Sequence, residues 1–310
     1  MKKIFLSFVL CCVACYGYGQ RQDSALLFSY FINNGEDGLH FAWSKDGYSW
    51  QALKGGSSFL TPTAGVDKLM RDPCIIRGGD GLFHMVWTVS WNEKSIGYAS
   101  SKDLVNWSPQ QDIPVMAHEN DALNCWAPEI FYDAANSEYM IYWATTIPGR
   151  FPESDTAGDS KYNHRMYYVT TKDFKTFSRA AVLYDKGFNV IDASIHKEGQ
   201  RYIMFLKNET LKPVPEKNIR MATSTQLTAG YGQASKPITG NYWAEGPTAV
   251  KWQGKWIVYF DKYTQHAYGA VTSTDLLHWQ DESDKVSFPK GLRHGTVLKV
   301  SFAELQKLMQ

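Results

Sequence analysis

Four widely separated residues of this 310-residue chain have the side chains that acid–base hydrolysis uses. Asp72, Asp192, Glu245 and His294 each stand at or near the start of a short apolar stretch. Hydrolysis by carboxyl groups needs one that donates a proton and one that is ionised and activates water. If the three carboxyls meet, their like charges favour this division of roles. The sequence must therefore be examined for a fold that brings the four residues together.

The stretches around these residues belong to a pattern that recurs along the chain. Each full copy has an apolar strand, a polar or glycine-rich turn, and a second apolar and aromatic strand. A second marker follows in each unit, a polar turn that leads to an aromatic residue. These aromatic residues are Trp50, Trp107, Phe177, Tyr231 and Trp279. The repeat of roughly 50 to 65 residues fits one four-stranded propeller blade with loop insertions.

The last copy, which opens at His294, nearly reaches the end of the chain and lacks a second strand. Residues 25–31 at the start of the chain are apolar and supply the missing strand. Such pairing closes a ring and removes exposed sheet edges. We therefore predict an all-β fold, a five-bladed β-propeller whose ring is closed by pairing N-terminal strands with the last innermost strand. Residues 301–310 are expected to form a short terminal helix, with Ser301 as its cap.

The first residues have the pattern of an export signal. Lys2 and Lys3 precede an apolar run that is too short to span a membrane, and Gly17-Tyr18-Gly19 resembles a cleavage site. We predict a signal peptide over residues 1–19 and a single propeller catalytic domain over residues 20–310. The protein would then be periplasmic or extracellular. A lipid-anchored form, modified at Cys15, is the weaker alternative.

Composition excludes several classes of partner. The net charge of +1 offers no basic excess for nucleic acid, and no transmembrane segment is visible. We expect a monomer. Outside the signal only Cys74 and Cys125 remain, and we expect two buried free thiols rather than a disulfide.

The innermost strands of a propeller converge on a central channel, so the residues that open them point at one place. Apolar neighbours on both sides of Glu245, Trp243-Ala244 and Gly246-Pro247, would disfavour its ionised form. Arg71 next to Asp72 would keep that carboxyl ionised.

Five short motifs in this order resemble glycoside hydrolase family 43, and the resemblance covers essentially everything after the signal. The motifs are Arg71-Asp72-Pro73, Trp126-Ala127-Pro128, Ile191-Asp192-Ala193-Ser194, Glu245-Gly246-Pro247 and His294-Gly295. The family consists of five-bladed propeller enzymes that act on arabinose- and xylose-containing polysaccharides. The resemblance implies an inverting mechanism with Asp72 as general base, Glu245 as general acid and Asp192 as the carboxylate that tunes the acid. It also implies no required cofactor, with a water or a structural metal ion near His294 in the channel.

Four further residues are candidates for substrate binding: Trp126, Trp243, Arg293 and Glu129. Packing between sheets is the alternative for the two tryptophans, and structural hydrogen bonding for Glu129. The polar insertion over residues 148–164 is expected to overhang and close the pocket, which favours action on a terminal sugar or side chain.

These observations favour a secreted inverting glycoside hydrolase that acts on oligo- or polysaccharide, with α-L-arabinofuranosidase as the first expectation. A β-xylosidase or arabinanase of the same family is the alternative within the class. A non-catalytic carbohydrate-binding propeller is the rival from another class, and it would tolerate loss of a carboxylate. An interaction scaffold would need no carboxylates in the channel.

Overall fold

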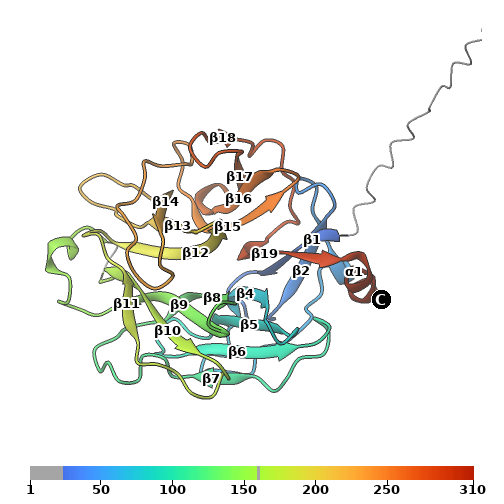
Figure 1. Ribbon diagram of the computed structural model, residues 1–310, viewed down its shortest axis with the longest axis horizontal. Coiled ribbons are helices and arrows are strands. Elements are labelled where there is room, and N and C mark those ends of the chain that lie inside the picture. The colour runs from blue at the N-terminus through green and yellow to red at the C-terminus, as the bar shows by residue number, and fades with distance from the viewer. Residues whose placement is uncertain (1–23, 159–160) are drawn as a thin grey trace, which may run out of the picture.

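The computed structural model describes residues 24–158 and 161–310, which form five β-sheets arranged in a ring (Figure 1). The predicted signal peptide and Cys15 lie outside the described residues. We number the sheets as blades I to V. In each blade the innermost strand is named first. Blade I contains β19 (Arg293–Ser301), β1 (Ser24–Phe31), β2 (His40–Ser44) and β3 (Gln51–Ala52). Blade II contains β4 (Arg71–Arg77), β5 (Phe83–Thr88), β6 (Ile96–Ser101) and β7 (Gln111–Ile113). Blade III contains β8 (Trp126–Asp133), β9 (Glu138–Thr146), β10 (His164–Thr171) and β11 (Ala181–Tyr184). Blade IV contains β12 (Val190–Glu198), β13 (Arg201–Asn208) and β14 (Asn218–Ser224). Blade V contains β15 (Glu245–Trp252), β16 (Lys255–Lys262), β17 (Ala267–Ser273) and β18 (Gln280–Asp281).

The predicted propeller and its closure are confirmed. β1 pairs antiparallel with β19 from Ser24 opposite Ser301 to Phe31 opposite Arg293, so the first and last described strands share one sheet. Blade IV departs from the four-stranded expectation, because only three strands form there. Loop residues Ser235 and Ile238 instead donate backbone hydrogen bonds to β14.

Side chains from neighbouring blades form the core between each pair of sheets. Between blades II and III, for example, Val86 and Ile96 pack with Ile141 and Trp143, and all four are fully buried. The alternation of inward and outward residues along each strand lets both faces of a blade enter such a cluster. The high aromatic content of the chain is largely used here, as large side chains fill the wedges between radial sheets.

A bulge interrupts four of the innermost strands at the same place. The pairing with the next strand shifts just after the first residue of β4, β8 and β15, and just after the second residue of β12. The residue that follows the last regular pair then has a left-handed backbone, with φ of 53° at Asp72, 46° at Ala127, 51° at Asp192 and 58° at Gly246. Such bulges redirect side chains, and residues other than glycine adopt this conformation only at a cost. The bulged residues Asp72, Ala127 and Asp192, and Glu245 just before Gly246, all line one mouth of the channel.

The terminal helix is also confirmed. α1 (Phe302–Leu308) begins after Ser301, whose hydroxyl accepts a hydrogen bond from the backbone of Glu304 in a capping box. Three short 3-10 turns, at Leu53–Gly56, Pro152–Ser154 and Tyr263–Gln265, complete the described elements. Among the residues that the structure describes, no helix is long and apolar enough to cross a membrane.

Candidate active site

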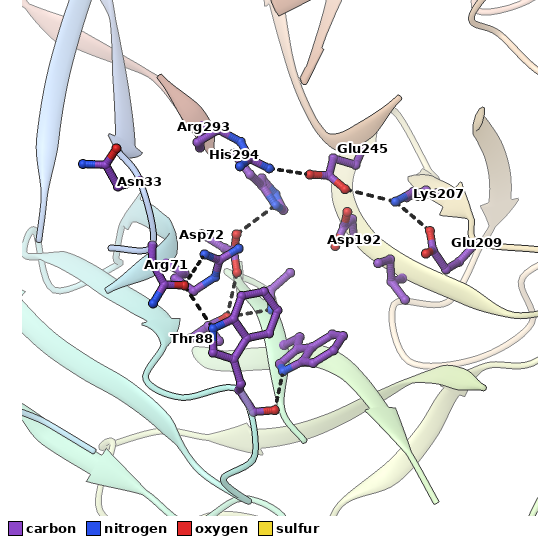
Figure 2. A pocket seen from close by; sticks show the side chains of 15 residues that line it. Asn33, Arg71, Asp72, Thr88, Asp192, Lys207, Glu209, Glu245, Arg293 and His294 are labelled. Atoms are coloured by element: carbon purple, nitrogen blue, oxygen red, sulfur yellow. Dashed lines mark hydrogen bonds and ion pairs between the residues drawn. The ribbon is translucent and has the colours of Figure 1, made fainter. Parts of the chain in front are cut away.

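A pocket of about 430 Å³ opens at the bulged ends of the innermost strands (Figure 2). Asp72, Asp192, Glu245 and His294 all line it, although they come from four different blades. The fold therefore brings together the four residues that the sequence singled out. Trp126 and Arg293, two of the candidates for substrate binding, line the same pocket.

Asp72 is a buried carboxylate held in its ionised form. Its Oδ2 accepts a hydrogen bond of 2.8 Å from the hydroxyl of Thr88, and its Oδ1 lies 3.3 Å from Nδ1 of His294. Burial alone would raise the pKa of Asp72. The hydrogen bond and charge of His294, the charge of Arg71 and the hydrogen bond of Thr88 outweigh burial and lower that pKa to about 2.

His294 is the cation that faces this carboxylate. Burial would lower the pKa of its imidazole, but Asp72, Asp192 and Glu129 together raise it to about 9. His294 is therefore protonated at neutral pH. Because its side chain is only 9% exposed, the ion pair with Asp72 is poorly screened by solvent.

Asp192 has the opposite electrostatic environment. Burial raises the pKa of Asp192 to about 6; His294 and Lys207 oppose this rise, whereas the negative charges of Glu245 and Asp72 add to it. Its Oδ2 accepts a 3.0 Å hydrogen bond from the backbone N–H of Gly246. Asp192 is thus fixed to the residue that follows Glu245, and its charge changes near neutral pH.

The prediction that Glu245 has apolar surroundings is wrong. One carboxylate oxygen, Oε1, accepts a 2.9 Å hydrogen bond from Nη2 of Arg293, and the other, Oε2, accepts a 3.1 Å hydrogen bond from Nζ of Lys207. Chain neighbours on a strand alternate between faces, so Ala244 and Gly246 do not determine what the carboxyl meets. The cations that surround this carboxyl come from other strands.

Sequence reasoning missed a second set of polar residues, which lie at or next to the end of the second strand in three blades. Thr88, Lys207 and Asp261 stand opposite Arg71, Ile191 and Glu245 in the strand pairing. Each reaches the first strand of the next blade: Thr88 accepts from Ala127 N–H, Lys207 binds Glu245, and Asp261 binds Arg293. A polar residue directly after an apolar second strand was the available signal.

Aromatic side chains form one wall of the pocket. Trp91, which the sequence analysis did not select, is 40% exposed and lies edge-on to Trp126, with ring centroids 5.3 Å apart. The guanidinium of Arg71 stacks on Trp91 at 4.2 Å and on Phe31 at 4.6 Å. An exposed indole beside a polar cavity is a surface on which a sugar ring can stack.

Two of the expected substrate contacts lie elsewhere. Glu129 does not line the pocket; it is 6% exposed, accepts a 2.9 Å hydrogen bond from the Tyr142 hydroxyl, and lines a second cavity among the later residues of the innermost strands. Burial raises the pKa of Glu129 to about 7. Trp243 is also outside the pocket lining, and it packs against Tyr263 and Lys217. Both positions point to structural roles.

The insertion over residues 148–164 does not close the pocket with its described residues, since none of them lines it. Instead, Tyr162 packs on Trp126 and on His164, with centroids 4.7 Å and 5.4 Å away. Arg165, fully buried, holds the base of the insertion through Glu153 and Asp185. The insertion therefore supports the aromatic wall from behind.

No group of three histidine, cysteine, aspartate or glutamate side chains is arranged to hold a metal within residues 24–158 and 161–310. The water or metal ion expected near His294 stays a prediction. Cys74 and Cys125 are buried and unpaired, as expected.

The channel mouth of this five-bladed propeller gathers three carboxyls, the groups with which glycoside hydrolysis donates one proton and activates water. Residues 22–306 match the family model of a probable glycosyl hydrolase domain related to family 43. The chain belongs to this family, and it is a glycoside hydrolase of the family 43 type.

Similar proteins agree with this assignment. An α-L-arabinofuranosidase of Bifidobacterium longum subsp. longum is 25% identical over 270 residues, covering 74% of this chain and 25% of that protein. The chain thus spans about a quarter of the length of that relative. The structure of an α-L-arabinofuranosidase from Clostridium thermocellum shares the fold, with a TM-score of 0.53, 15% identity, and coverage of 82% of this chain and 91% of that one. An α-L-arabinofuranosidase from Lactobacillus brevis has a TM-score of 0.52 and 18% identity over 69% and 72% of the chains.

Proposed function

We propose that this protein is a secreted, inverting, exo-acting α-L-arabinofuranosidase. The observation that carries the proposal is the pocket itself, where an ionised Asp72 beside the His294 cation shares the cavity with Glu245 on another blade. The arabinofuranosidases among the similar proteins support the choice of sugar.

In the proposed reaction Asp72 is the general base. Its low pKa keeps it ionised, and the donors Thr88 and His294 fix the orientation of its oxygens. It takes a proton from a water that attacks the anomeric carbon. Glu245, as general acid, gives its proton to the leaving oxygen while the bond to that oxygen breaks. Inversion follows because the water and the leaving group occupy opposite faces of the sugar.

Asp192 is proposed as the residue that tunes and orients the acid. It accepts the N–H of Gly246, and the negative charge of Glu245 contributes to raising its pKa. Since these two carboxyls influence each other, a proton gained by Glu245 favours the ionised form of Asp192.

The test compares hydrolysis of 4-nitrophenyl α-L-arabinofuranoside and of 4-nitrophenyl β-D-xyloside, with the anomer of the released sugar followed by NMR. We expect turnover of the arabinofuranoside with inversion. Glu245→Gln, which removes the acid but keeps the shape, should lower the rate on natural glycans by about 10²- to 10⁴-fold. An unchanged rate in this variant contradicts the assignment. Turnover of the xyloside alone favours the β-xylosidase, and glycan binding without turnover favours a non-catalytic propeller.

A further inference from the structure

Glu245 lies in the middle of a row of alternating charges that crosses three blades. Asp261 binds Arg293. Arg293 in turn binds Glu245, Glu245 binds Lys207, and Lys207 binds Glu209 (Figure 2). The Arg293 Nε to Asp261 Oδ2 distance is 2.5 Å, and the Lys207 Nζ to Glu209 Oε2 distance is 2.6 Å. Lys217 ends the row on the other oxygen of Glu209.

The row creates a conflict with the acid role of Glu245. Both of its oxygens accept hydrogen bonds from cations, and neither an ammonium nor a guanidinium can accept a hydrogen bond in return. Each carboxyl oxygen has two lone pairs, and a proton cannot sit on the lone pair that faces a cation. Release of one cation therefore frees an oxygen of Glu245 to direct its proton at the leaving group.

The two cations differ in their freedom to move. The side chain of Lys207 is 2% exposed, and its ammonium is held by Glu209 and lies 4.8 Å from the ring centroid of Tyr263. The side chain of Arg293 is 34% exposed, lines the pocket, and keeps its bond to Asp261 through Nε when Nη2 is released. Of the two contacts, the one with Arg293 is therefore the one that a substrate in the pocket can replace.

We propose that Lys207, which Glu209 holds in place, is a positioning residue that fixes Oε2 of Glu245 as a hydrogen-bond acceptor. The transferable proton then sits on Oε1 of Glu245. A substrate oxygen replaces Oε1 as the partner of Arg293. The inference rests on the proposed function. It assigns the donor oxygen of the acid, and it gives Nη2 of Arg293 a substrate oxygen to bind.

The same contact assists the chemical step. As the bond to the leaving oxygen breaks, that oxygen keeps the electron pair and takes the proton from Oε1, and a water proton passes to Asp72. Glu245 becomes negative during this transfer, directly beside the buried ammonium. Burial would lower the pKa of Lys207, but Glu209, Glu245 and Asp192 raise it well above its usual range, so the ammonium stays charged. A fixed charge that meets developing charge stabilises the transition state more than the ground state.

The test compares substrates whose leaving groups differ in their need for a proton from the general acid. Glycosides of phenol need protonation of the leaving oxygen, and those of 2,4-dinitrophenol do not. Lys207→Met keeps the length of the side chain but removes the charge. We expect kcat on the phenyl glycoside to fall by about 10²-fold or more, and on the dinitrophenyl glycoside by less than about 5-fold, because acid catalysis typically contributes 10²- to 10⁴-fold. The control is Lys255→Met, whose ammonium pairs with Glu282 outside the pocket, and it should leave both rates unchanged.

Glu245→Gln separates this inference from the function on which it rests. If Glu245→Gln shows no dependence on the leaving group, the acid assignment fails. If the rate of Glu245→Gln depends on the leaving group, but Lys207→Met loses activity equally on both substrates or on neither, the role of Lys207 is overturned. Should Lys207→Met unfold, Glu209→Gln decides, since it keeps the ammonium and removes its clamp. It should show the same selective loss at a smaller size, and an equal loss on both substrates would again overturn the proposal.

Discussion

Replacing His294 by Gln tests how the protein keeps its proposed base ionised. Gln retains a hydrogen-bond donor near Asp72 but carries no charge, so the substitution isolates the electrostatic part of the contact. The imidazolium lies 3.3 Å from Oδ1 of Asp72, and it also lowers the pKa of Asp192. Arg71 and Thr88 remain as partners of Asp72 after the substitution. Both carboxyls should therefore hold protons more tightly in the variant.

Coulomb's law sets the size of the effect. Two unit charges 3.3 Å apart interact by about 1.3 kcal/mol at the dielectric constant of water and by about 5 kcal/mol at an effective constant of 20. At about 1.4 kcal/mol per pKa unit, these limits correspond to roughly 1 to 4 units. Because an opposite charge at this range typically shifts a carboxyl by about 1 to 3 units, we expect the pKa of Asp72 to rise by that amount.

The assay is the pH dependence of kcat/KM on an aryl glycoside that the wild type hydrolyses. A base must be ionised, so the acid limb of the profile should move to higher pH by about 1 to 3 units. The direction is the same whether Asp72 or Asp192 governs the limb. His196→Gln, at a half-buried histidine that lies outside the pocket, is the matched control and should leave the limb in place. If the limb of the His294→Gln variant stays in place, or moves to lower pH, the reasoning is refuted.

Stability, substrate affinity and packing give three further tests. His294 has a folded pKa of about 9 against an ordinary value of 6.5, so its stabilisation is complete below pH 6.5 and is lost as pH rises through 9; thermal unfolding of His294→Gln should vary less across this window than that of the wild type. Trp91→Ala removes the exposed indole, and KM should rise by about 2- to 10-fold with kcat little changed, since an aromatic contact contributes about 0.5–1.5 kcal/mol; an unchanged KM would exclude stacking there. Arg165→Met removes the buried cation that binds Glu153 and Asp185, and urea unfolding should show a loss of about 1–3 kcal/mol, as when buried polar groups lose a hydrogen-bond partner. A loss below about 1 kcal/mol would show that these contacts behave as a surface pair.

The propeller could be predicted because its blades repeat, and because the repeat places one apolar strand of each unit at the channel. Asp72 and Asp192 were found for the same reason, since each lies near the start of such a strand. Lys207 could not be found in this way. It lies next to the end of a second strand, and its nearness to Glu245 depends on the strand register and on how one blade packs against the next.

The wrong expectation for Glu245 has the same origin. Its apolar neighbours in the chain suggested an apolar site, but a strand directs adjacent side chains to different faces. The carboxyl therefore meets Arg293 and Lys207, which lie 48 and 38 positions away in the sequence. The environment of a charged group at a propeller channel is set by residues that only the closed ring brings close.

The pairing of β1 with β19 also sets a time at which activity can begin during synthesis on the ribosome. β1 precedes and β19 follows every other strand that the structure describes. His294 and Arg293 both lie on β19, so they are among the last parts of the site to be made. Earlier blades can fold as they emerge. Until β19 joins β1, however, Asp72 lacks its imidazolium and Glu245 lacks its guanidinium, so a nascent chain holds the carboxylates without the charges that organise them.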